Sequence, residues 1–223
     1  MLATVGGMGI VAVLLLAAGL RRRGHRRHLA AMAGAAGLNY HPADTLDLRR
    51  RYSRLTLLRE GHDRSIWDVI TGSTCYGTLS CFAFRYEIGF GAQRVVQRWL
   101  VTVMETDRER GRVALRRCSC GFEQGSAWDV SGRPFAGPPG SQAGWTTMAR
   151  CREGLAAPGD DFLRWLDEQG RDLCIELCDH LIALQVPLGN HAAQVEWLLR
   201  VGPAVVRRLT EPAPAGGDSR ADS

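Results

Sequence analysis

The side chains with the widest range of chemistry in this sequence are seven cysteines, at Cys75, Cys81, Cys118, Cys120, Cys151, Cys174 and Cys178. Structural zinc sites usually take their ligands from two Cys-x2-4-Cys pairs, but this chain has only Cys118-x-Cys120 and no second pair with suitable spacing. In an extended strand, Cys174 and Cys178 would point the same way but lie about 13 Å apart, too far to share an ion. We therefore predict no metal site. Unpaired cysteines in an odd number are ordinary in a reducing compartment, which favours the cytosol.

Other candidate reactive groups lack the surroundings that their chemistry requires. Ser119 could act as a nucleophile with His62 or His180, but no Gly-x-Ser-x-Gly elbow surrounds it. Gly89 and Gly91 follow an expected strand, yet the third glycine and the helix of a dinucleotide-binding loop are missing. The sequence therefore predicts no catalytic residue and no cofactor.

A cluster of five arginines without an intervening acid is the charged feature with the clearest physical role. Its members are Arg21, Arg22, Arg23, Arg26 and Arg27. The formal net charge of the whole chain is +5, so the rest of the chain is close to neutral. A neutral domain has no basic face for a phosphate backbone, which argues against nucleic acid as a partner.

An uncharged apolar run, Leu2 to Leu20, directly precedes these arginines, and Thr4 is its only side chain with a hydrogen-bonding group. A helix of this length reaches about 28 Å, close to the bilayer's hydrocarbon thickness of about 30 Å. A buried core helix and a cleaved signal peptide are the alternatives. A core helix seldom lacks a polar face at this length, and a signal peptide would have its basic stretch before the run. We predict a single transmembrane helix.

The arginine cluster also predicts the orientation of this span. Positive charge stays on the cytoplasmic side, so the N-terminus should lie outside and the C-terminal domain in the cytoplasm. The same arginines could attract anionic lipid headgroups, at roughly 1 kcal/mol for each basic residue near the surface.

Beyond the span, hydrophobic periodicity and turn residues predict an α+β domain. The expected elements are a helix at His25 to Gly37, a short helix at Leu46 to Leu55 capped by Asp44, strands at Ile66 to Ile70, Thr78 to Ile88, Val95 to Thr106 and Arg112 to Arg117, a loop at Ser131 to Gly144, a helix at Asp160 to Gln169, two strands within Leu173 to Val186, and a final helix after Gly189-Asn190. Polar turns are expected at 107–111 and near Asp179-His180, and Pro203 should kink or restart the last helix.

The clearest strand is Thr78 to Ile88, where Phe82, Phe84, Tyr86 and Ile88 alternate with smaller or charged residues and predict one buried aromatic face. We expect a mostly antiparallel sheet of about five or six strands with helices packed on one face. The predicted organisation is a transmembrane helix at 1–20, a basic juxtamembrane helix or linker at 21–37, a cytoplasmic α+β domain at 38–210 and a disordered tail at 211–223.

Several segments in this order resemble a loose group of uncharacterised bacterial single-pass membrane-anchored proteins with a cytoplasmic α+β domain. The matching segments are Gly37-Leu38-Asn39-Tyr40, Asp68-Val69-Ile70-Thr71-Gly72, Phe82-Ala83-Phe84-Arg85-Tyr86 and Val101-Thr102-Val103, after the charge-stopped N-terminal run. The resemblance covers roughly residues 1 to 106, and it implies an architecture but no activity, cofactor or catalytic residue.

Two functions remain open at this level. The sequence favours an interaction or regulatory module tethered to the cytoplasmic face of the membrane, because the neutral domain shows no convergent set of acids, bases or ligands. The alternative is a membrane-tethered, cytosol-facing enzyme of unknown reaction, since catalytic groups can assemble from distant residues. The expected partners are the lipid bilayer, anionic headgroups and an unidentified protein, but not nucleic acid.

Overall fold

The computed structural model describes residues 2–117, 134–135, 145–150, 160–170 and 172–210, and for some of these, including 2–16, only the backbone. Most of the loop predicted at Ser131 to Gly144 and the whole tail predicted at 211–223 lie outside these residues. The described helices are α1 (Leu2–Ala35), α2 (Leu48–Arg51), α3 (Asp160–Glu168) and α4 (His191–Thr210), with 3-10 turns η1 (Leu57–Arg59) and η2 (Gly91–Gln93).

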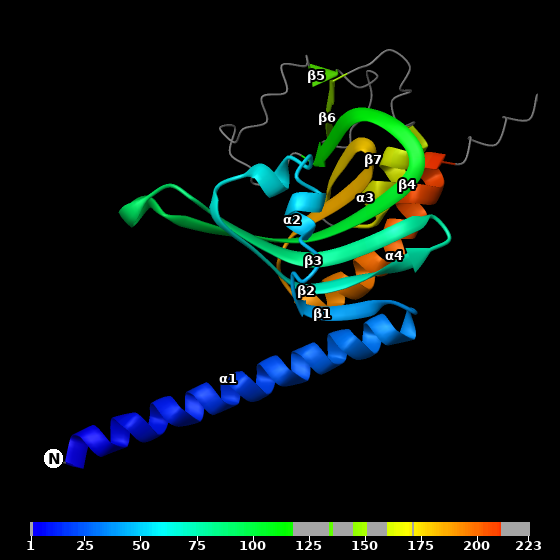
Figure 1. Cartoon of the computed structure of the whole chain (residues 1–223). Helices are drawn as coiled ribbons and strands as arrows, with labels where there is room; N and C mark the ends of the chain where they lie inside the picture. Colours follow the sequence, from blue (N-terminus) through cyan, green and yellow to red (C-terminus); the bar gives the residue numbers. More distant parts are fainter. Residues whose placement is uncertain (1, 118–133, 136–144, 151–159, 171, 211–223) are drawn as a thin grey trace, which may run out of the picture.

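The described strands form one seven-stranded sheet in which every pairing is antiparallel. They are β1 (Asn39–Ala43), β2 (His62–Thr74), β3 (Gly77–Ile88), β4 (Val95–Arg117), β5 (Pro134–Phe135), β6 (Trp145–Arg150) and β7 (Cys174–Pro187). The path runs β1-β2-β3-β4-β6-β5, and β7 also pairs with β4. The predicted α+β class and antiparallel sheet are therefore confirmed (Figure 1).

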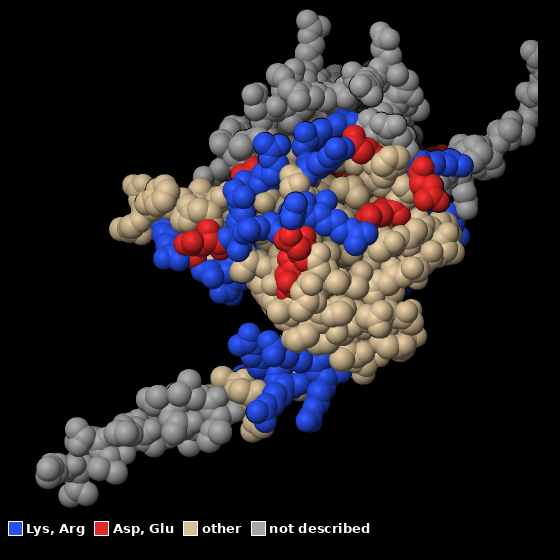
Figure 2. Space-filling model, in the orientation of Figure 1, with Lys and Arg blue, Asp and Glu red and all other residues tan. Residues whose placement is uncertain are grey.

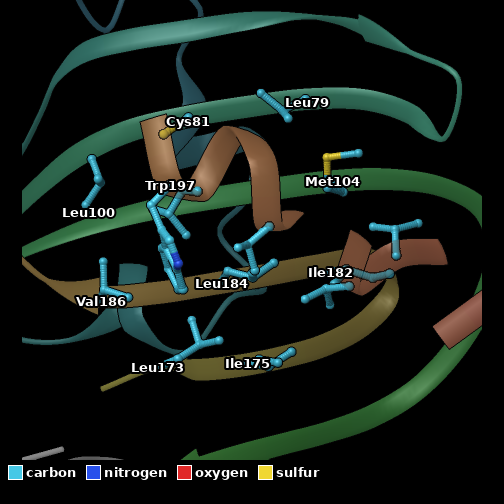
Figure 3. Packing of buried hydrophobic residues seen from close by; sticks show 14 of the residues in the cluster. Leu79, Cys81, Leu100, Met104, Leu173, Ile175, Ile182, Leu184, Val186 and Trp197 are labelled. Carbon is cyan, nitrogen blue, oxygen red and sulfur yellow. The ribbon is translucent and has the colours of Figure 1, made fainter. Parts of the chain in front are cut away.

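Apolar side chains cover both faces of this sheet. On one face, Leu79 and Cys81 of β3 belong to a cluster with residues of α1, α3, α4 and β7, part of which Figure 3 shows around Trp197. On the other face, Phe82 and Phe84 pack in a second cluster with the segment of α2 and η1. The prediction that helices pack on one face only was therefore wrong. The segment of α2 and η1 packs its leucines onto the second face.

This second cluster confirms most of the predicted aromatic face, whereas the helix predicted at Leu46 to Leu55 is shorter, only Leu48–Arg51. Phe82, Phe84 and Tyr86 are buried, whereas Ile88 at the end of β3 is 42% exposed. Leu48, Tyr52 and Leu55 are buried together on this face, as their spacing predicted. The Leu48 amide donates a hydrogen bond of 2.9 Å to Asp44 Oδ1, so Asp44 satisfies the first amide of α2, although the N-cap position itself is Asp47.

The two predicted turns at 107–111 and Asp179-His180 are wrong, and they fail for a common reason. β4 and β7 are each one continuous strand, and they pair with each other along most of their length. Their register shifts on both sides of the Arg110–Asp179 pair, and Asp179 has a left-handed φ of 55°. The polar residues at these positions form opposite sides of one irregular bend, so the chain curves there without reversing (Figure 1).

Three described strands, β1, β5 and β6, form where none was predicted. β1 runs through His41-Pro42, which was expected only to break a helix, and it pairs with β2 alone. Proline is tolerated at such an edge because its missing N–H is not needed for the ladder. β5 lies inside the predicted loop, and it pairs with β6, which pairs with β4.

Helix α1 is continuous from Leu2 to Ala35, so the predicted juxtamembrane segment is helical. Its C-terminal end packs on the sheet, with Leu29 and Ala33 fully buried. No helix within the described residues combines the length and apolar character needed to cross a membrane. The span predicted at Leu2 to Leu20 falls largely on residues whose side chains are outside that description, so it stays a prediction. At the other end of the chain, α4 continues through Pro203 and does not restart there.

Candidate functional site

The five predicted arginines lie on α1 between its N-terminal half and the end that packs on the sheet. Arg21, Arg22, Arg23 and Arg27 are exposed, and Arg26 is partly buried. Figure 2 shows them as a basic patch beneath the rest of the molecule, at the place where α1 leaves it. Their side chains are thus free to meet anionic groups around the helix.

The connection between β3 and β4 forms an apolar projection. Its exposed side chains, called here the hairpin tip, are Ile88 at 42% exposed, Phe90 at 82%, Val95 at 51% and Val96 at 41%. Figure 1 shows this connection extending from the sheet toward the same side as the N-terminal half of α1. Four exposed apolar side chains on one turn are more than scattered surface residues, and such patches usually mark an interaction site.

Charged groups stabilise the base of this hairpin. Glu87 has a fully buried side chain and forms ion pairs with Arg85 and Arg94. Arg94 and Arg85 accordingly hold the pKa of Glu87 below its ordinary value. The His62 ring stacks on Phe90 at 4.7 Å between ring centroids, and its Nε2 lies 2.8 Å from the Gly89 carbonyl oxygen. The tip is therefore presented by an ordered turn.

A second candidate site lies where α1 meets the sheet, and it centres on Asp68 of β2. Asp68 has a left-handed φ of 51° and lies where the register of β2 against β3 shifts, between Trp67 and Ile70. Its side chain is 6% exposed. The Tyr40 hydroxyl of β1 donates a hydrogen bond of 2.6 Å to Asp68 Oδ1. The irregular backbone thus directs a carboxylate into the junction of α1, β1 and β2.

Two imidazoles face the other oxygen of this carboxylate. His25 of α1 and His191 at the start of α4 lie 3.8 Å and 3.7 Å from Asp68 Oδ2, measured from Nε2 and Nδ1 respectively. The same two nitrogens are 3.1 Å apart. We call His25, Asp68 and His191 the junction cluster. It connects three elements that are distant in sequence.

Burial changes the protonation of the groups around Asp68. It lowers the pKa of His191, although the Asp68 carboxylate opposes the shift. Burial and the hydrogen bond to Asp68 raise the pKa of Tyr40. At neutral pH, His191 is therefore a neutral imidazole and Tyr40 remains a hydrogen-bond donor. Such a set of donor atoms can hold a cation.

Sequence reasoning considered the cysteines and missed the junction cluster. Cys118, Cys120 and Cys151 lie outside the described residues, while Cys81, Cys174 and Cys178 are buried. Burial raises the pKa of the Cys81 thiol to about 12, which makes it unreactive. No local motif joins His25, Asp68 and His191. A faint signal was Asp68 itself, the one acid within the apolar segment Ile66 to Ile70 of β2.

A comparison with protein families and a comparison with curated protein sequences both found no match. Among solved structures, the chain is similar to the crystal structure of the mycobacterial trehalose monomycolate transport factor A, TtfA, with a TM-score of 0.50. The sequence identity is 16%, and the similarity covers 86% of this chain and 99% of the crystallised TtfA chain. A likeness at this identity concerns the fold alone.

Proposed function

We propose that this chain is a membrane-tethered interaction module whose domain is held in a fixed orientation at the cytoplasmic face of the bilayer. The observation that carries this proposal is the continuity of α1, which runs from the apolar segment through the arginines into the hydrophobic core. Leu29 and Ala33 are fully buried there. Because the helix has no break between the apolar segment and the core, the domain cannot swing freely as it would on a flexible linker.

The arginine cluster supports the orientation. Its exposed side chains follow the apolar run directly, where positive charge is retained on the cytoplasmic side. Anionic headgroups at that surface would attract the same side chains within about a Debye length. The domain would then lie close to the membrane, with its contacts to α1 at the membrane side.

The hairpin tip supports a second contact with lipid. It extends toward the side of the molecule on which the N-terminal half of α1 lies (Figure 1). Phe90 is its most exposed side chain, and Arg94 beside it is 50% exposed. An apolar turn with an adjacent arginine suits an interface where a ring enters the headgroup region and a cation meets phosphate.

The structural similarity to TtfA suggests which kind of protein partner to look for. TtfA is by its name a transport factor for trehalose monomycolate, a lipid. We propose that this chain also acts in the transport of a lipid, and that it does so through a membrane-protein partner. A pull-down of the full chain from a detergent extract should then recover a lipid transporter reproducibly, and recovery of no membrane protein would count against this part of the proposal.

Photo-crosslinking tests the fixed orientation. A photoreactive phenylalanine analogue is placed at Phe90 in the full chain in native membranes, and in a matched control at Ser73, an exposed residue near the opposite end of the β2–β3–β4 meander. The proposal expects lipid adducts from position 90 and few from position 73. Equal labelling at the two positions would show that the domain has no fixed orientation to the bilayer.

A further inference from the structure

We propose that His25, Asp68 and His191 bind one divalent transition-metal ion, Zn²⁺ in the first instance. This inference is independent of the proposed membrane function, because it rests on the geometry and chemistry of the three side chains. It also goes against the absence of a metal site that the sequence predicted.

The spacing of the donor atoms fits a single zinc ion. Ligands bound to Zn²⁺ at about 2.1 Å in a tetrahedron lie roughly 3.4 Å from one another. His25 Nε2 and His191 Nδ1 are 3.1 Å apart, and they lie 3.8 Å and 3.7 Å from Asp68 Oδ2. These separations bracket the expected value. All three atoms therefore reach a common centre with only small side-chain movements.

The types of donor also suit a transition metal. Two imidazole nitrogens and one carboxylate oxygen are common ligands of zinc and of other first-row metals. The distances from Asp68 Oδ2 to the imidazoles exceed those of good hydrogen bonds. Asp68 Oδ2 is therefore a buried carboxylate oxygen without a close hydrogen bond to either ring, and a cation between the three groups would stabilise its charge.

A neighbouring contact holds the carboxylate donor in place. The Tyr40 hydroxyl donates to Asp68 Oδ1 and leaves Oδ2 directed toward the histidines. His191 Nε2 is buried and has no hydrogen-bond partner among the described residues, so the polar interactions of this ring run through Nδ1. An outer hydrogen bond to a ligating carboxylate is the usual support of a metal site.

A second group of described residues could offer metal ligands, but its carboxylate is already paired with arginines. His62, Asp63 and Glu87 also bring three donor atoms together. Glu87, however, already forms ion pairs with Arg85 and Arg94, which supply its counter-charge. A cation there would have to displace two guanidinium groups. Among the described residues, the ion pairs of Asp68 are with His25 and His191 and include no arginine.

An ion at the junction would join α1, β2 and α4. Three protein ligands leave one coordination position for water or another small ligand, and the side chain of His25, 32% exposed, marks the open side. The ion would hold the C-terminal half of α1 against β2 and α4. Metal content would then control how firmly the helix is held.

The test uses the full chain without a polyhistidine tag, purified in detergent and measured by mass spectrometry for bound metal. We expect about one zinc ion per chain, and near-complete loss in His25→Gln and Asp68→Asn. His28→Gln, an exposed histidine on the same helix, is the matched control and should retain the metal. A wild-type chain that neither contains zinc nor takes it up on titration would overturn the proposal.

Two further measurements separate this site from misfolding and from the cysteines. Tyr40→Phe keeps all three donors and should weaken zinc affinity by about 10- to 100-fold, as loss of an outer-shell contact usually does. Co²⁺ bound in place of zinc should lack the intense near-ultraviolet absorption of thiolate ligation. Strong thiolate absorption, or zinc retained in folded His25→Gln, would assign the metal to cysteines and overturn the proposal.

Discussion

Glu176 is a buried acid of β7 that connects the segment between α2 and η1 to the sheet. Its side chain is 2% exposed on β7. The Thr56 amide and hydroxyl both donate to its carboxylate, at 3.0 Å and 2.8 Å, and Gln185 Nε2 lies 3.4 Å away. Arg112 is its ion-pair partner at 3.5 Å. Burial outweighs these contacts and raises the pKa of Glu176 above its ordinary value.

The raised pKa of Glu176 predicts a pH dependence of stability. The folded state binds the proton of Glu176 more strongly than the unfolded state does. Protonation of this group therefore contributes most to the free energy of unfolding below the unfolded pKa. That contribution is lost as pH rises through the folded pKa. Relative to Glu176→Gln, the free energy of unfolding of the wild type should therefore increase as pH falls from 7 toward 4.5. Urea titrations of both chains at several pH values would measure this, and a difference that is flat or decreases toward acid would contradict it.

At the residue scale, the sequence could reveal clusters that are contiguous but not those assembled by the fold. The five arginines stand within seven positions of one another, so their charge and their place after the apolar run were visible. His25 and His191 are 166 positions apart, and they meet only because α4 returns to the end of α1. The bulge that turns Asp68 toward them depends on the pairing of β2 with β3, which no local pattern encodes.

The turn between β2 and β3 provides a test at the scale of one element. Gly77 has a φ of 122°, and a Cβ atom added there would lie 1.9 Å from the carbonyl oxygen of Glu105 on β4. Gly91 also has a positive φ, 60°, but a Cβ atom there would meet nothing within 4 Å. The two glycines therefore differ in the space around them, while both have backbone conformations unfavourable to other residues.

Alanine at these two positions should give unequal losses of stability. Gly91→Ala should cost roughly 1 kcal/mol from the left-handed backbone alone. Gly77→Ala should cost at least about 3 kcal/mol, because β3 and β4 must separate locally to admit the methyl group. Chemical unfolding of the two variants would measure the difference, and equal losses would mean that the strands adjust without strain.

At the element scale, prediction succeeded where a pattern was local and failed where pairing decided the outcome. The aromatic positions of Thr78 to Ile88 and the spacing of Leu48, Tyr52 and Leu55 were local signals, and the burial that they predicted was confirmed except at Ile88. Polar residues near 107–111 and Asp179 have the composition of turns. They remain in long strands because β4 and β7 pair with each other on both sides of a shared bend. Polarity alone cannot distinguish a chain reversal from a bend.

The attachment of α1 is a property of the whole molecule, and Leu29 tests it. Leu29 is fully buried between α1 and the sheet, whereas Leu46 is 39% exposed before α2. Leu29→Ala should reduce the free energy of unfolding by about 2–5 kcal/mol because it removes buried methyl groups and leaves a cavity. Leu46→Ala, the matched control, should have a much smaller effect. Similar losses in the two variants would indicate that α1 packs loosely and can move relative to the domain.

The orientation of the whole molecule in the membrane should depend on the arginine cluster. Replacing Arg21, Arg22, Arg23, Arg26 and Arg27 with glutamine removes the charge that we propose retains this side in the cytoplasm, but it leaves the apolar run intact. The helix should therefore still insert, with mixed orientation. A reporter fused after Ser223 that is active only in the cytosol should lose part of its signal, in proportion to the inverted fraction.

Arginines far from the apolar run provide the control for this prediction. Arg49 and Arg50 are exposed on and around α2, beyond the roughly 15–20 residues over which flanking charge acts on orientation. Glutamine at these two positions should leave the reporter signal unchanged. If the five-arginine variant also keeps full signal while its membrane insertion is verified, charge does not set the topology. The folded domain would then hold the chain on its side of the bilayer, because a compact sheet with two buried faces must unfold before it can cross.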